Sequence, residues 1–145
     1  MEATVVIIGM DLYRKILSAF PAVPPESGCI LGSREDVVCS FEYDRGLPRL
    51  DMAVYTPNVE VLDRVIQRWS TEGIRFHGLA HSHPCGQESL SSGDIAYIHT
   101  IMRAMPAGIE RLYFPLVFPG EKIISFVAIR RQNEIEILPD DMIIK

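Results

Sequence analysis

The sequence predicts a mixed α/β fold in which about three helices flank a mixed β-sheet. Strand-like and helix-like segments follow one another in the order β-α-β-β-β-α-β-α-β-β-β, without the regular alternation of a doubly wound fold. The 145 residues are 48% hydrophobic and 23% charged, which is enough apolar sequence for one core. We therefore expect residues 1–145 to form a single domain.

The first half of the chain is expected to contain one helix and four strands. Thr4–Ile8 is a continuous β-branched run typical of a strand. Asp11–Phe20 has apolar residues at helical spacing, and Pro21 ends this helix. Three more strands are expected at Glu26–Gly32, Val37–Tyr43 and Leu50–Tyr55.

The second half is expected to contain two helices and four strands. Thr56-Pro57 is typical of a helix start, with threonine as the N-cap, and Gly73 ends the helix. Apolar residues on one face of this helix include Trp69, which we interpret as a packing residue. The last helix is expected at Ser92–Met105. The strands are expected at Ile74–His81, Arg111–Phe118, Ile123–Arg130 and Glu134–Leu138.

Composition and charge exclude several classes of function. The net charge of −5 argues against a nucleic-acid partner, because such binding depends on clustered Lys and Arg. No apolar run approaches the roughly 20 residues of a membrane-spanning helix, so no membrane association is expected. The N-terminus has an acidic residue where a signal peptide carries positive charge. Cys29, Cys39 and Cys85 lack CxxC spacing and are interpreted as free thiols, which favours a cytoplasmic protein.

The most informative pattern is H-x-H-P-x6-S-x2-D, which runs from His81 to Asp94. Alternate side chains of a strand share a face, so His81 and His83 point the same way, and Asp94 arrives from the first turn of the next helix. Two imidazoles and one carboxylate leave an open position on a tetrahedral zinc, as in catalytic sites. Ser91 and Asp94 also match a helix N-terminal capping pattern, which is compatible with metal binding because a cap fixes where Asp94 points.

This pattern resembles the motif of the JAMM (MPN+/JAB) zinc metalloproteases. That family places an essential glutamate far upstream, at the head of a glycine-containing strand. Glu26–Gly32 (ESGCILG) resembles this second segment. The resemblance implies an MPN/JAB fold, which is a curved mixed β-sheet flanked by helices and related to the cytidine deaminase fold.

The resemblance also implies roles for five residues. His81, His83 and Asp94 correspond to the ligands of a Zn²⁺ cofactor. Glu26 corresponds to the general base, which takes a proton from water and returns it to the leaving amine. Ser91 corresponds to the residue that donates a hydrogen bond to the developing oxyanion.

The function implied is that of a metallo-isopeptidase of the prokaryotic stand-alone JAB type. Such an enzyme hydrolyses the amide bond after the Gly-Gly tail of a ubiquitin-like or sulfur-carrier protein, and it accompanies an E1-like activating enzyme. The bond can be an isopeptide or a linear peptide. Two alternatives remain: a non-catalytic MPN scaffold, and a relative of the RadC-like proteins, which share the motif but usually carry an N-terminal DNA-binding module.

Other candidate residues have simpler interpretations. His77 is expected about 13 Å from His81 along the strand, too far to share a metal, and His99 faces elsewhere on its helix. Cys85 is interpreted as a loop cysteine, with a redox-sensitive spare ligand as the alternative. A nucleobase deaminase would need H-x-E and P-C-x-x-C, and the sequence contains neither.

Overall fold

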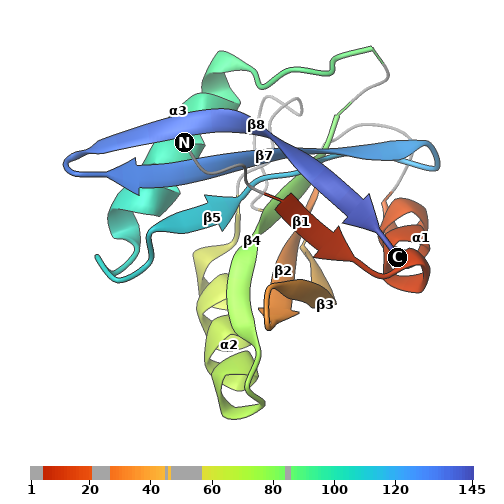
Figure 1. Cartoon of the computed structure of the whole chain (residues 1–145), viewed down its shortest axis with the longest axis horizontal. Coiled ribbons are helices and arrows are strands. Elements are labelled where there is room, and N and C mark those ends of the chain that lie inside the picture. The colour runs from red at the N-terminus through yellow and green to blue at the C-terminus, as the bar shows by residue number, and fades with distance from the viewer. Residues whose placement is uncertain (1–4, 21–26, 45, 47–56, 84–85) are drawn as a thin grey trace.

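The computed structural model describes residues 5–20, 27–44, 46, 57–83 and 86–145, and within them it contains three helices and eight strands (Figure 1). The helices are α1 (Met10–Ala19), α2 (Val59–Thr71) and α3 (Ser92–Ala104). The strands are β1 (Val5–Ile8), β2 (Gly28–Arg34), β3 (Val37–Asp44), β4 (Arg75–Ser82), β5 (Arg111–Tyr113), β6 (Leu116–Phe118), β7 (Lys122–Arg131) and β8 (Glu134–Ile144). The predicted mixed α/β class is confirmed. The strand expected at Leu50–Tyr55 lies outside the described residues.

The strands form one mixed sheet that closes on itself. Its order is β2-β3-β1-β8-β7-β5-β4, and β2 also pairs antiparallel with β4, so the first and last strands of this series are neighbours. The short strand β6 pairs with both β4 and β7. This barrel-like closure corrects the expectation of a simply curved sheet. The sheet closes because β2 is hydrogen-bonded to β3 on one edge and to β4 on the other, so neither edge of β2 is open.

Three predicted boundaries are wrong, each for a local reason. The strand expected at Arg111–Phe118 is two strands, interrupted at Phe114 and Pro115, where proline offers no backbone N–H. The last strand continues to Ile144 because β1 pairs with its C-terminal end. The N-cap of α2 is Asn58 and not Thr56: its side-chain oxygen accepts hydrogen bonds from the N–H groups of Glu60 and Val61.

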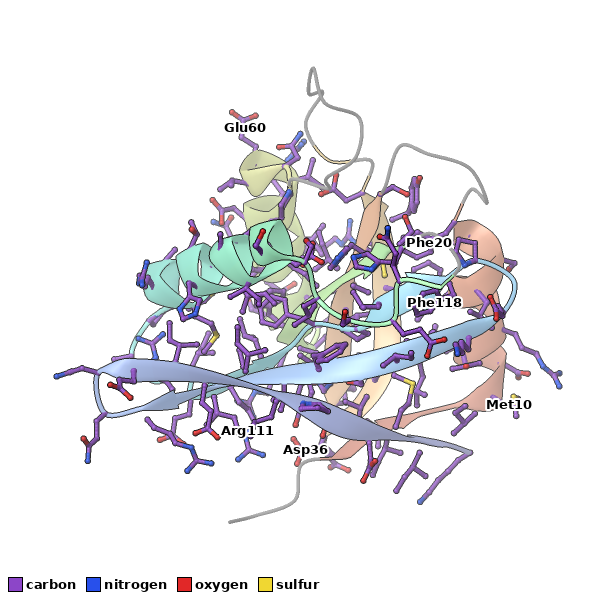
Figure 2. All side chains as sticks on the ribbon, turned by 90° about the horizontal axis from the view of Figure 1, so that it is seen from above. Met10, Phe20, Asp36, Glu60, Arg111 and Phe118 are labelled. Carbon is purple, nitrogen blue, oxygen red and sulfur yellow. The ribbon has the colours of Figure 1, made fainter. Side chains whose placement is uncertain are left out.

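Two hydrophobic clusters hold the helices against the sheet. The first contains residues of α2 and α3 with Ile30 and Leu79, and the second contains residues of α1 and β1 with Leu31 and Ala80. Figure 2 shows side chains filling the space between α3 and the strands beside it. Neighbouring residues of β4 enter different clusters, so this strand is buried on both faces. Its position is therefore tightly fixed.

Trp69 is the packing residue that the sequence predicts. It is only 3% exposed and lies in the first cluster. Its ring approaches the backbone of Gly32 so closely that a Cβ there would lie 2.9 Å from ring carbons and 2.6 Å from Ile74. Glycine at this position thus lets α2 pack close to β2. Among the described helices, none has the length and apolar character needed to cross a membrane.

Candidate metal centre

The side chains of His81, His83 and Asp94 come together where β4 ends and α3 begins. The predicted cap positions Asp94: Ser91 Oγ accepts from the Asp94 N–H at 3.1 Å, and the Ser91 N–H donates to Asp94 Oδ2 at 2.9 Å. This reciprocal pair is a capping box, and it fixes the carboxylate at the first turn of α3. The predicted capping pattern is therefore confirmed.

The three side chains form a compact and buried cluster. One potential ligand atom from each residue lies within 4.8 Å of the other two. His81 Nε2 is 3.1 Å from Asp94 Oδ1, and His83 Nε2 is 2.9 Å from Asp94 Oδ2. The residues are 0%, 4% and 1% exposed, in the order His81, His83, Asp94. The expectation that the two histidines share a face and meet Asp94 is confirmed.

The far nitrogen of each imidazole also has a partner. Nδ1 of His83 lies 2.9 Å from the backbone oxygen of Gln87, and Nδ1 of His81 lies 3.0 Å from the hydroxyl of Tyr97. Histidines that bind metals have such partners, which orient the ring and leave the other nitrogen for the ion. The sequence analysis missed Tyr97. Its spacing of three residues from Asp94 on one helix was the available signal, because such residues lie on the same helical face.

Burial and hydrogen bonding set the charges of the cluster. Burial lowers the pKa of His81, and its contacts with Asp94 offset this effect only in part. Burial acts to raise the pKa of Asp94, but the contacts with His81 and His83 and the hydrogen bond from the Ser91 N–H outweigh it and hold this pKa far below its usual range. The cluster therefore combines a neutral His81 with an ionised Asp94.

The donor set fits a divalent cation. The Gln87 carbonyl can only accept a hydrogen bond, so His83 carries a proton on Nδ1. In the neutral ring, Nε2 then directs a lone pair toward the Asp94 carboxylate, and a cation between the two groups compensates this arrangement. Two imidazole nitrogens and one carboxylate oxygen are ligands typical of Zn²⁺ with an open coordination position.

Of the two other predicted site residues, Glu26 and Ser91, the structure describes only Ser91. Glu26 lies outside the described residues, as does Cys85. Ser91 is exposed, and its Oγ is the acceptor of the helix cap, so its hydroxyl proton remains to be donated elsewhere. Its role toward an oxyanion stays a prediction.

A hydrogen-bond network ties the start of β2 to the end of β4. The Ser27 N–H donates to Ser82 Oγ at 3.0 Å, and the Ser82 N–H donates to the Ser27 oxygen at 2.8 Å. The Tyr43 hydroxyl donates to Ser27 Oγ at 2.8 Å. Ser82 lies between the two histidines of the cluster, so this network fixes the residue after Glu26 beside the candidate metal centre.

His99 belongs to a different part of the molecule. It lines a cavity of about 490 Å³ together with Arg103 of α3 and residues of the β7–β8 hairpin. None of the three clustered residues lines this cavity. His77 is likewise outside the cluster: its ring stacks on Tyr113 with centroids 4.3 Å apart, as expected for a packing residue.

His77 predicts a pH dependence of stability. Its pKa is lowered from 6.5 to about 4, mainly because the ring is buried. The negative charge of Asp36 acts to raise this pKa, and the positive charge of Arg75 acts to lower it further. His77 binds a proton more readily in the unfolded chain than in the folded one. Its contribution to the free energy of unfolding is therefore fully present above pH 6.5 and decreases as the pH falls toward 4. The loss amounts to at most about 3 kcal/mol of unfolding free energy.

Urea unfolding of the wild type and of His77→Phe at pH 7, 5.5 and 4 measures this contribution. The variant keeps a ring to stack on Tyr113 but cannot be protonated. Its stability should therefore decrease less between pH 7 and pH 4 than that of the wild type. Equal decreases in the two proteins would contradict the prediction.

This fold occurs in other solved structures, among them the following three. The solution structure of a protein from Desulfitobacterium hafniense aligns over 98% of this chain and 93% of its own, with a TM-score of 0.65 and 17% identity. The crystal structure of a JAB1/MPN domain protein from Archaeoglobus fulgidus aligns over 100% of both chains, with a TM-score of 0.54 and 16% identity. A protein from Salinibacter ruber aligns over 95% of this chain and 90% of its own, with a TM-score of 0.52 and 17% identity.

Identities of this size show the fold alone. The chain therefore has an MPN-like fold, as the sequence pattern predicts. The sequence matches no protein-family model, and no curated protein is significantly similar to it.

Proposed function

We propose that this chain is a zinc-dependent peptidase of the JAMM type, which hydrolyses the amide bond after the C-terminal tail of a ubiquitin-like or sulfur-carrier protein. One observation carries the proposal: a buried cluster of His81, His83 and Asp94 whose ligand atoms lie within 4.8 Å of one another. The MPN-like fold supports it, because a JAB1/MPN domain protein is among the structures that share the fold.

In this proposal each residue has a defined task. His81, His83 and Asp94 hold the metal. Held by these residues with an open position, a zinc ion would supply Lewis acidity and would lower the pKa of a water there to about 7. Glu26 accepts the water proton and transfers it to the leaving amine. The Ser91 hydroxyl donates a hydrogen bond to the oxygen that becomes negatively charged.

The hydrogen bonds of Ser27 support the role of Glu26. Glu26 precedes Ser27 in the sequence, and the backbone of Ser27 is bonded to Ser82, between the two histidines. A general base must lie within hydrogen-bond reach of the water from which it takes a proton. The anchoring of Ser27 beside the candidate metal centre supports this role for the residue that precedes it in the sequence.

The proposed substrate has a tail of small residues, Gly-Gly, in an extended conformation. Small side chains need little space, which suits a tail whose end must reach a buried metal centre. We propose a cytoplasmic setting and an associated E1-like activating enzyme. A non-catalytic MPN scaffold would not need the complete and clustered set of ligands found here.

The proposal is tested by cleavage of Gly-Gly-tailed ubiquitin-like fusions and lysine conjugates. Zinc-loaded wild type is expected to cleave at least one substrate, and chelation or His81→Ala is expected to stop cleavage. His99→Ala is the matched control, because this histidine lines a separate cavity, and it should remain active.

Cleavage that persists after metal removal would overturn the metal mechanism. Zinc binding without cleavage of any fusion or conjugate would instead favour the scaffold. A preference for fusions over lysine conjugates would identify a linear peptide bond as the target.

A further inference from the structure

We infer that Tyr97 is a positioning residue of the candidate metal centre. Its hydroxyl accepts a hydrogen bond from Nδ1–H of His81 and so leaves Nε2 of that histidine available to the metal. This inference rests on the zinc site of the proposed function. It adds a residue of α3 that touches a ligand and not the metal.

The contact between Tyr97 and His81 is close and well fixed. The hydroxyl lies 3.0 Å from Nδ1, and His81 is completely buried. The Tyr97 ring meets His81 edge-on at a centroid distance of 5.6 Å and meets Phe114 edge-on at 6.1 Å. These two ring contacts hold the tyrosine in a position where its hydroxyl reaches His81.

The two histidines differ in how strongly their tautomer is set. The partner of His83 is a backbone carbonyl, which only accepts, so the proton of this ring is held on Nδ1. The partner of His81 is a hydroxyl, which can accept or donate. If Tyr97 donated, the proton of His81 would be on Nε2 and this atom could not bind a metal. Tyr97 must therefore accept for both histidines to present Nε2.

Helix α3 carries both the orienting residue Tyr97 and the candidate ligand Asp94. Tyr97 follows Asp94 by three residues in α3, so both side chains leave the same face of the helix. The first turns of α3 therefore place Tyr97 beside His81 and Asp94 beside both histidines. One helix start thus supplies one ligand and controls the orientation of another.

Tyr97→Phe tests this role because it keeps the ring and removes only the hydroxyl. We expect the zinc dissociation constant, measured by competition with a chelating dye, to rise about 10- to 100-fold. Tyr13→Phe is the matched control: its hydroxyl accepts a hydrogen bond from the Ile123 N–H at 3.1 Å, in the cluster around α1. This control should bind zinc like the wild type.

Two spectroscopic measurements complement the zinc affinities. ¹⁵N NMR of the zinc-loaded wild type should show His81 protonated on Nδ1, and Co²⁺ substitution should give a visible spectrum that changes in Tyr97→Phe but not in Tyr13→Phe. A proton on Nε2 of His81, or unchanged zinc affinity in Tyr97→Phe, would overturn the role of Tyr97. If the wild type still cleaved substrate in a zinc-dependent way, the proposed function would stand. A wild type that binds no zinc would overturn both.

Discussion

Replacing Glu26 with glutamine is expected to reduce cleavage about 10³-fold, the scale on which a positioned general base contributes. Glutamine has nearly the shape of glutamate, but its amide cannot take a proton from water. Glu26 has no proposed part in holding the metal, so zinc should remain bound at the wild-type affinity. The measurement is the rate of cleavage of a Gly-Gly-tailed fusion, with zinc content determined on the same sample.

Glu60→Gln provides the matched control for this substitution. Glu60 is exposed in the first turn of α2 and points away from the body of the molecule (Figure 2). Glu60→Gln changes the charge by the same amount as Glu26→Gln but at an exposed position. The cleavage rate of this variant should therefore equal that of the wild type. Full activity of Glu26→Gln would refute the proposed general base. Loss of zinc in this variant would instead make Glu26 a ligand.

The parts of the site that could be predicted from sequence follow local rules. Alternation along a strand places His81 and His83 on one face with Ser82 on the other, and the structure confirms this arrangement. The pattern from Ser91 to Asp94 predicts a helix cap, and the capping box forms. Each rule involves residues that are neighbours in the chain, where stereochemistry leaves few choices.

The parts that could not be predicted depend on residues far apart in the chain. The pairing of β2 with β4 closes the sheet, and nothing in the periodicity of either strand specifies its partner. The contact of Tyr97 with His81 likewise depends on how α3 packs across the end of β4. Smaller errors arose where two nearby residues could both cap a helix. Asn58, two positions after the predicted Thr56, is the N-cap of α2.

These long-range features place the metal centre on a rigid part of the fold. Strand β4 pairs with β2 on one edge and with β5 and β6 on the other, and it is buried on both faces. A strand held in this way cannot shift by a fraction of an ångström without disturbing its neighbours. The positions of His81 and Asp94 are therefore set by the closed sheet and by the cap of α3.

The same rigidity predicts that Gly78→Ala is severely destabilising. Gly78 lies in β4 opposite Tyr113 of β5, and a Cβ built on it would lie 1.8 Å from the Tyr113 carbonyl oxygen and 2.6 Å from its carbonyl carbon. These are backbone atoms of a paired strand, so no side-chain rotation relieves the overlap. We expect a loss of about 3 kcal/mol or more of unfolding free energy, at the upper end for overpacking.

Gly108→Ala tests whether any new methyl group would have this effect. A Cβ at Gly108 meets no atom within 4 Å, so its unfolding free energy should stay within about 0.5 kcal/mol of the wild type. Urea unfolding of the metal-free proteins measures both. A Gly78→Ala variant as stable as the wild type would mean that β4 and β5 can separate at little cost. The metal centre would then need another source of rigidity, because β4 carries His81 three residues further along.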